Sequence, residues 1–244
     1  MFEFNAFKGL DKPAAPTLSS YQGASGLGNL TTDLASPTVV AQLIADPTTT
    51  ASIETYLKDT YLSAGALTTP EQQQAAILYS DLNLKTTSAD VLVNNIVSVV
   101  AAGIPTDATV ESLMKDIVPT DVAGDPVKFS AMMNALLDAS TAYLALGDSI
   151  PAGTSAPAGT NLGDVAQKAA IAYTVQTAVD TIAQAVGAGT TTEDAITQIY
   201  YLLYDPTNAA LSANVTSQPF ANPFTAPPAG LTNILDAAGV TLPS

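Results

Sequence analysis

The chain has 244 residues, of which 47% are hydrophobic and 12% charged, so it is long enough and apolar enough to bury a core. Its formal net charge of −15 arises from 22 acidic residues against 7 lysines, and it contains no Arg, His, Cys or Trp. This composition excludes disulfides, thiolate metal sites and cysteine nucleophiles. It also excludes the clustered basic surface that binds nucleic acid or anionic bilayers.

The first 35 residues are predicted to be an extended tail or tether. Prolines and glycines interrupt a Ser- and Thr-rich stretch that shows no helical period over residues 1–35. Phe2, Phe4 and Phe7 nevertheless supply three of the 6 phenylalanines in the protein. Because three aromatic rings are costly to leave in water, we expect the tail to dock on the body or to lie near a membrane or a partner.

A helical domain is predicted over residues 36–214, where apolar residues recur every three or four positions. The string Thr69-Pro70-Glu71-Gln72 has the spacing of a capping box, and Asp125 precedes a proline as a helix N-cap does. The most apolar helix is expected to begin at Ser88, and Gly147 is expected to end a long helix as its C-cap. No stretch alternates as a strand does, and no apolar run has the length of a membrane span. The fold class is therefore all-α.

A weak internal repeat relates residues 73–79 to residues 167–173. It suggests two modules, near 50–118 and 126–205, stacked as helical hairpins in a bundle or a short α-solenoid. Ala75-x₃-Tyr79 resembles the second helix of a tetratricopeptide unit, and the Asp-Pro-Thr that follows two of the predicted helices resembles its end. No 34-residue period accompanies that resemblance, so chance similarity among Ala-rich helices stays an alternative to duplication.

The last 30 residues are predicted to form a Pro/Phe strap, residues 215–244, that ends in a short helix. Pro219-Phe220 and Pro223-Phe224 recur at a spacing of four residues. Proline favours extended backbone, so we expect a segment that lies over the helices and places its two Phe rings in gaps between them.

One short segment of the sequence resembles a catalytic motif. Ala145-Leu146-Gly147-Asp148-Ser149-Ile150 resembles the nucleophile block of the GDSL (SGNH) hydrolases, in which the Ser attacks an ester. That resemblance implies a β-strand before the block and a downstream Asp-x-x-His, and this chain has no His to activate the hydroxyl. We expect a helix end followed by a turn, and no catalytic residue.

Two further patterns have structural interpretations. Ser112 and Lys115 match the Ser-x-x-Lys spacing of penicillin-binding proteins, but they are expected on the exposed face of one short helix. Asp116, Asp121 and Asp125 form the densest acidic group, and their spacing does not fit an EF-hand. Capping and turn roles are expected for these carboxylates, with weak Ca²⁺ binding as the alternative. No metal or cofactor is predicted.

The candidate binding residues are tyrosines, which bury a ring while offering a hydroxyl. Tyr200, Tyr201 and Tyr204 crowd one predicted helix, and Tyr79 and Tyr173 occupy matching positions of the repeated segments. These five residues are expected either to line a groove for a ligand or partner, or to form the edge of the core.

The leading hypothesis is a non-catalytic helical binding or scaffolding protein. Its composition is typical of an exported bacterial protein in the periplasm or cell envelope, and a start methionine replacing a processed leader would make it a lipoprotein body tethered through its N-terminus. The partner is expected to be another protein. A carrier of a small hydrophobic ligand, with Met132 and Met133 beside the cavity, is the second hypothesis, and a GDSL-like serine hydrolase is the third.

Overall fold

The computed structural model describes residues 14–63, 65–87, 89, 91, 92, 95, 108–150, 162–187, 189–205, 219–220 and 223–240. The protein is all-α, as predicted, and the one β-bridge found among the described residues joins Thr109 to Pro219. The elements are η1 (Leu18–Tyr21), α1 (Gly26–Leu34), α2 (Pro37–Ala45), α3 (Pro47–Leu57), the π-helical turn η2 (Lys58–Leu62), α4 (Pro70–Thr86), α6 (Val110–Ile117), α7 (Pro126–Ser149), α8 (Leu162–Val186), α9 (Thr192–Tyr204) and α11 (Ala229–Ala238).

Local side-chain hydrogen bonds fix where several helices begin. The predicted capping box is present at α4, where the Gln72 backbone N–H donates to Thr69 Oγ1 and the Gln72 side chain accepts from the Thr69 N–H. Asp125 caps α7 as predicted, because its carboxylate accepts from two backbone N–H groups of the first turn. Asp46 has two roles, since it follows the last residue of α2 and also caps the first turn of α3.

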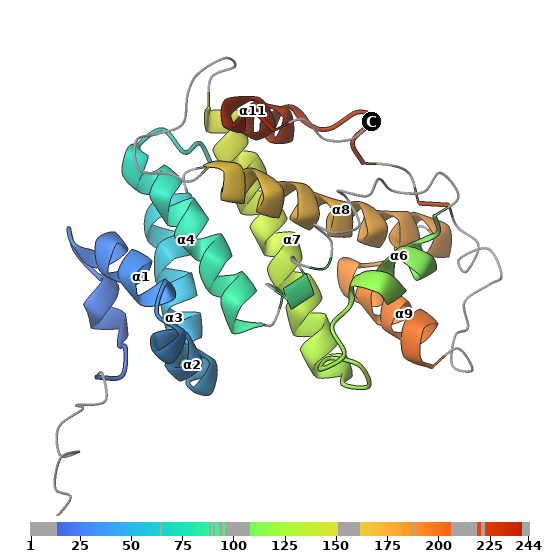
Figure 1. Cartoon of the computed structure of the whole chain (residues 1–244), viewed down its shortest axis with the longest axis horizontal. Helices are drawn as coiled ribbons and strands as arrows, with labels where there is room; N and C mark the ends of the chain where they lie inside the picture. Colours follow the sequence, from blue (N-terminus) through green and yellow to red (C-terminus); the bar gives the residue numbers. More distant parts are fainter. Residues whose placement is uncertain are drawn as a thin grey trace, which may run out of the picture.

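Helix α7 lies at the centre of the molecule and packs against α4, α8, α9 and α11 (Figure 1). Its Phe129, Met132, Met133 and Leu136 are fully buried. We call the core around it the central cluster: the buried apolar side chains of α6, α7, α8, α9 and α11, joined by Ala76 and Leu84 of α4 and by Phe220. Helix α11 also packs on α7 from far along the chain. The choice between a bundle and a solenoid stays a prediction, as does the internal duplication.

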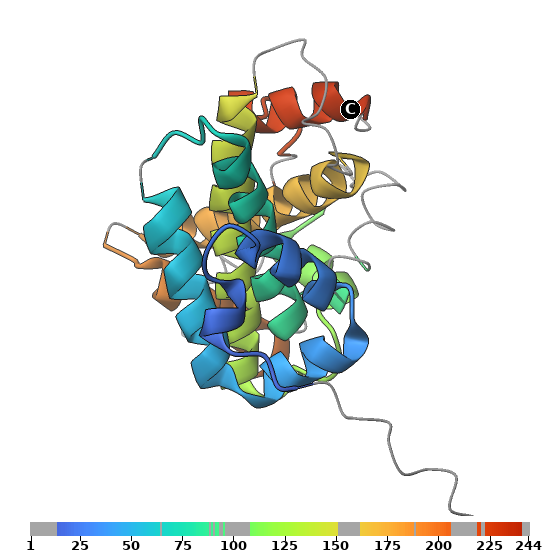
Figure 2. The same ribbon diagram turned by 90° about the vertical axis from the view of Figure 1, so that its left-hand side faces the viewer.

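A second, smaller core lies beneath α1, α2 and α3, which face the viewer in Figure 2. One face of α4 closes it from below, with Ala75, Leu78, Tyr79 and Leu82. We call this core the N-terminal cluster. Its other buried side chains are Tyr21, Leu27, Leu30, Leu34, Val39, Leu43, Ile53, Leu57 and Ala142.

The N-terminal cluster corrects the prediction of an extended tail over residues 1–35. Residues 26–34 form α1, whose Leu27, Leu30 and Leu34 are buried with Tyr21. Gly26, one of the glycines that suggested a loop, serves a close contact instead, because a Cβ there would lie 1.9 Å from the Tyr21 carbonyl oxygen. Phe2, Phe4 and Phe7 lie outside the described residues.

A half-buried ion pair links α8 to α4. Lys168 Nζ lies 2.7 Å from Asp81 Oδ1 of α4 and 2.7 Å from Asp164 Oδ2 of its own helix. Burial lowers the pKa of Lys168, but the two carboxylates outweigh it and raise the pKa above its ordinary value. The Tyr143 hydroxyl is also buried, and burial followed by the charge of Asp81 raises its pKa.

Helices α7 and α11 cross in backbone contact at two glycines. A Cβ on Gly147 would lie 1.8 Å from the Gly230 carbonyl oxygen, and a Cβ on Gly230 would lie 2.4 Å from the Leu144 carbonyl oxygen. Asn233 Nδ2 also donates to the Gly147 carbonyl at 3.0 Å. The predicted C-cap role of Gly147 is therefore wrong: α7 continues to Ser149, and the glycine is required by the neighbouring helix.

The C-terminal segment is described in part. The Phe220 backbone N–H donates to the Ala108 carbonyl at 2.8 Å, and its ring is buried in the central cluster, where the half-buried Phe224 also packs. The segment ends in α11, closed by Gly239 in the left-handed conformation. Most of the helix predicted from Ser88 lies outside the described residues, although Ala89 and Leu92 are helical and buried. Within the described part of the chain, none of the helices combines the length and apolarity that a membrane span needs.

Candidate functional site

Three of the five predicted tyrosines lie together on α9. The Tyr200 ring lies 5.5 Å from Phe129 of α7, 6.0 Å from Tyr201 and 5.2 Å from Tyr204 between ring centroids. Such tilted and edge-on ring pairs stabilise the packing of α9 on α7. All three tyrosines are half-buried, and burial followed by the proximity of Tyr200 raises the pKa of Tyr204. Tyr200 and Tyr204 pack against the central cluster, and Tyr201 contacts the ring of Tyr200.

A small recess lies beside this aromatic group, between the first turns of α7 and the middle of α9. Its volume is about 40 Å³, and Phe129, Ile196, Tyr200 and Tyr201 contribute to its lining. One water molecule occupies about 30 Å³ of liquid, whereas ligand pockets measure about 300–1,000 Å³. The recess is therefore too small for an organic ligand.

Tyr79 and Tyr173 lie elsewhere, so the five tyrosines do not form one site. Tyr79 is buried in the N-terminal cluster, and its hydroxyl donates to Asp138 Oδ2 of α7 at 3.3 Å. Burial first, and then the charge of Asp138, raises the pKa of Tyr79. Tyr173 is half-buried on α8 against the central cluster. Although Tyr79 and Tyr173 occupy matching positions in the repeated segments, they lie against different cores.

Ser149 lies in the last turn of α7, where the sequence resembles a hydrolase nucleophile block. Its Oγ donates to the Leu146 carbonyl at 2.6 Å and accepts from Gln73 Nε2 of α4 at 3.4 Å. A backbone carbonyl and an amide cannot remove the hydroxyl proton, and a helical residue is not held as the strained Ser at the end of a strand is. This geometry gives Ser149 a packing role.

The structure gives local contacts to Ser112, Lys115 and Asp125. Exposed Ser112 completes the capping box of α6 with Thr109, and exposed Lys115 pairs with Glu111 one turn away. Asp116 and Asp121 are exposed, and Asp125 is the cap of α7. Across the part of the chain that the structure describes, Asp and Glu residues do not gather in groups of three or more that would hold a metal ion.

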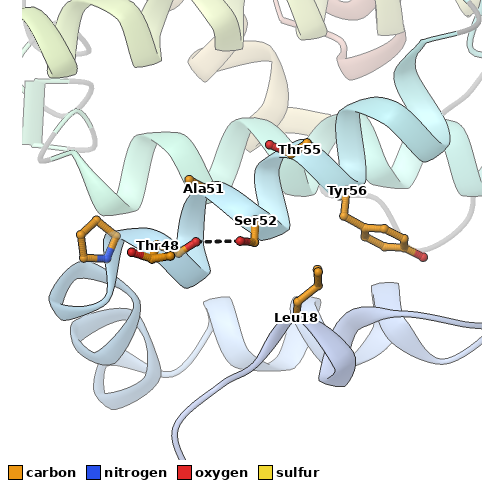
Figure 3. Close-up of a pocket in the computed structure, with 7 residues that line it drawn as sticks. Leu18, Thr48, Ala51, Ser52, Thr55 and Tyr56 are labelled. Atoms are coloured by element: carbon orange, nitrogen blue, oxygen red, sulfur yellow. Dashed lines mark hydrogen bonds between the residues drawn. The ribbon is translucent and has the colours of Figure 1, made fainter.

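A groove with a volume of about 720 Å³ lies between η1 and α3 (Figure 3). Leu18 of η1 forms one wall and points toward α3, while Ala51 and Tyr56 belong to the opposite wall. Its other lining residues are Pro47, Thr48, Ser52 and Thr55. The groove lies over the N-terminal cluster, because Thr50, Ile53 and Leu57 of α3 point inward and are buried.

The chemistry of the groove suits binding rather than catalysis. Its hydroxyls can both donate and accept hydrogen bonds, although Ser52 Oγ already donates to the Thr48 carbonyl at 2.8 Å (Figure 3). The nearest capping carboxylate, Asp46, precedes Pro47 at the end of the groove and is exposed. Hydrogen bonds from the backbone N–H and then the side chain of Thr49 hold its pKa below the ordinary value. Asp46 is therefore ionised at neutral pH.

Sequence reasoning missed the groove because its two walls were assigned to different regions. Leu18 belongs to the predicted tail, and α3 belongs to the predicted helical domain. A signal was nevertheless present in α3: Thr48, Ser52 and Thr55 share one face, opposite the apolar Ile53 and Leu57.

Comparison with protein-family models, with curated proteins and with solved structures finds no match to this chain. The groove between η1 and α3 is therefore interpreted from its own geometry and chemistry.

Proposed function

We propose that this chain is a non-catalytic helical binding protein that takes an extended polypeptide segment into the groove between η1 and α3. The observation that carries the proposal is the size and lining of this groove: about 720 Å³ of open space walled by Leu18, Ala51, Tyr56 and three hydroxyl side chains. Apolar side chains of a peptide can lie between these walls, while its backbone groups bond to hydroxyls. The groove lies on a helical frame that holds both walls in place.

The charge of the protein defines the chemistry of the partner. A net charge of −15 repels nucleic acid and acidic polypeptides, and it attracts a segment that carries Lys or Arg. Asp46, at one end of the groove, provides a carboxylate for such a cation. We therefore expect a segment that combines aromatic or aliphatic side chains with basic ones.

Site-specific photo-crosslinking tests this function in the full-length chain. The photoreactive residue p-benzoylphenylalanine replaces Thr55 in the groove, and a control variant carries it at Thr197, an exposed residue of α9. We expect adducts with a basic, aromatic partner segment from position 55 that are absent from position 197. These adducts should disappear when Ala51→Arg fills the groove with a positive charge, but persist with Ala51→Ser. Identical adducts at both positions, or adducts insensitive to Ala51→Arg, would contradict the proposal.

The enzyme hypothesis has a direct test with a short-chain chromogenic ester. We expect no hydrolysis that depends on Ser149, because its hydroxyl bonds to a carbonyl and an amide. Turnover that is lost in Ser149→Ala, with the fold retained, would show that the protein is a hydrolase.

The carrier hypothesis gains no support from the residues that suggested it. Met132 and Met133 are fully buried in the central cluster, and the recess beside the tyrosines holds about 40 Å³. We therefore propose a protein partner. Equilibration of the protein with a fluorescent fatty acid, with Ala51→Arg as the control for the groove, checks this choice.

An exported location in the periplasm or cell envelope, with or without a lipid tether, is part of the proposal. It is supported by the base-poor, Thr- and Ala-rich composition. Osmotic-shock fractionation of the native cells, with immunodetection of the protein, tests it: recovery with cytoplasmic markers would contradict the location.

A further inference from the structure

The groove between η1 and α3 lies within reach of the chain's own N-terminal residues. The described chain begins at Ala14, four residues before Leu18, which forms one wall. Phe7 precedes Ala14 by 7 residues, which can span up to about 24 Å when extended. The α3 wall from Pro47 to Tyr56 is about 14 Å long at a helical rise of 1.5 Å per residue. The segment is therefore long enough to extend along the groove.

The first 13 residues also have the chemistry that the groove requires. They carry three of the 6 phenylalanines, Phe2, Phe4 and Phe7, and two of the 7 lysines, Lys8 and Lys12. Only two of the 22 acidic residues fall in the same stretch, so the strong negative charge belongs to the rest of the chain. Aromatic side chains next to basic ones match a groove with apolar walls and an ionised carboxylate at its end.

We infer that residues 1–13 bind back into the groove between η1 and α3, with their Phe side chains against Leu18, Ala51 and Tyr56. This inference rests on the proposed function, because it gives the groove an occupant from the same chain. A tethered segment competes at a high effective concentration, so it excludes weak partners and yields to tight ones.

The absence of Cys allows a clean test by disulfide formation in the full-length chain. The test variant combines Ala6→Cys, between Phe4 and Phe7, with Ala51→Cys in the groove. The control combines Ala6→Cys with Thr197→Cys on α9, which lies on the other side of the molecule from α3 (Figure 1). Under mild oxidation we expect the intramolecular disulfide to form at least tenfold faster in the test variant. Adding Phe2→Ser, Phe4→Ser and Phe7→Ser should reduce that rate to the control rate.

Two results would overturn the inference. Equal rates in the two double variants would show that the segment is not held in the groove. Disulfide-linked dimers in place of closed monomers would show that a second copy occupies it.

Photo-crosslinking at Thr55 is scored separately from disulfide formation. If the two double variants form their disulfides at equal rates but position 55 gives specific partner adducts, the inference is wrong and the proposed function stands. If the disulfide forms fast but position 55 gives no partner adducts, even in a variant whose groove is freed by the Phe→Ser changes, the proposed function is wrong and the docked segment remains.

Discussion

The central cluster and the N-terminal cluster differ in the length of their helices and in how closely those helices pack. The central cluster joins helices of 24 and 25 residues, α7 and α8, and it draws α11 into backbone contact through Gly147 and Gly230. The N-terminal cluster joins helices of 9 to 11 residues and leaves the groove of about 720 Å³ between η1 and α3. Long helices in close contact form the central cluster, whereas short helices on one face of α4 leave a groove open beside η1.

Gly230→Leu tests the backbone contact between α7 and α11 and should have the largest effect. The added side chain must displace the Leu144 carbonyl, which a Cβ would approach to 2.4 Å, so we expect a loss of about 3 kcal/mol or more in the free energy of unfolding. Urea unfolding followed by circular dichroism measures it. Gly28→Ala, on α1 with open space around its Cβ, is the control and should gain about 0.5–1 kcal/mol. A loss below about 1 kcal/mol for Gly230→Leu would mean that α11 packs loosely.

Lys168→Met tests how much the ion pair between α8 and α4 contributes to stability. The change leaves the carboxylates of Asp81 and Asp164 without their shared cation, so we expect a loss of about 2 kcal/mol. Lys115→Met, in an exposed pair with Glu111, is the matched control and should cost less than about 0.5 kcal/mol. Hydrogen exchange should show faster opening of α1, α2 and α3 than of α7. Uniform loss of protection would mean that the clusters unfold as one unit.

Ala51→Phe and Ala76→Phe place the same ring in the open groove and in the closed core. Ala51 is exposed, so its substitution should change the free energy of unfolding by less than about 0.5 kcal/mol. Ala76 is fully buried in the central cluster, and Phe there should cost about 3 kcal/mol through overpacking. Thermal unfolding of both variants provides the comparison. Similar losses would show that the groove closes over Ala51 in solution.

Two carboxylates on α3 predict pH effects of opposite sign, which should be the smallest effects. Burial first, and then Asp138, raises the pKa of Glu54 above 4.5, so protonation stabilises the folded state, and this contribution is lost as pH rises through the folded pKa. Hydrogen bonds from Thr49 lower the pKa of Asp46 below 3.8, so its contribution is present above that value and is lost as pH falls through the folded pKa.

Glu54→Gln should therefore raise stability at pH 7 by less than about 1 kcal/mol, with the difference vanishing near pH 3. Asp46→Asn should lower stability at pH 7 and lose its effect in stronger acid. Urea titrations at several pH values measure both, and the same sign for the two variants at pH 7 would contradict the assignment.

Features set within one turn of helix were predictable from the sequence, whereas contacts between distant segments were not. The capping box of Thr69 and Gln72 and the cap at Asp125 depend on residues three or fewer positions apart. Gly147 was misassigned because glycine serves equally in a helix cap and in a helix crossing, and only the position of Gly230 decides between them.

The candidate site was predicted only in part for the same reason. Tyr200 and Tyr204 are one helical turn apart, so their proximity follows from α9 alone, but their partner Phe129 comes from α7. The groove was missed because α1 was interpreted as a tail, which removed the buried Tyr21 and the adjoining Leu18 from the folded body. Gly26, which is required by its close contact with the Tyr21 carbonyl, and the nearby Gly23 and Gly28 concealed that helix from an analysis of local propensity.

The crossing of α7 and α11 restricts how this sequence can vary. Since the carbonyl of Gly230 occupies the space where a side chain at position 147 would begin, neither position accepts even Ala unless the two helix axes separate. A wider axial spacing would in turn stretch the bond between Asn233 and the Gly147 carbonyl beyond its 3.0 Å. Positions 147, 230 and 233 should therefore covary: homologues in which one of them differs should carry compensating changes at the other two.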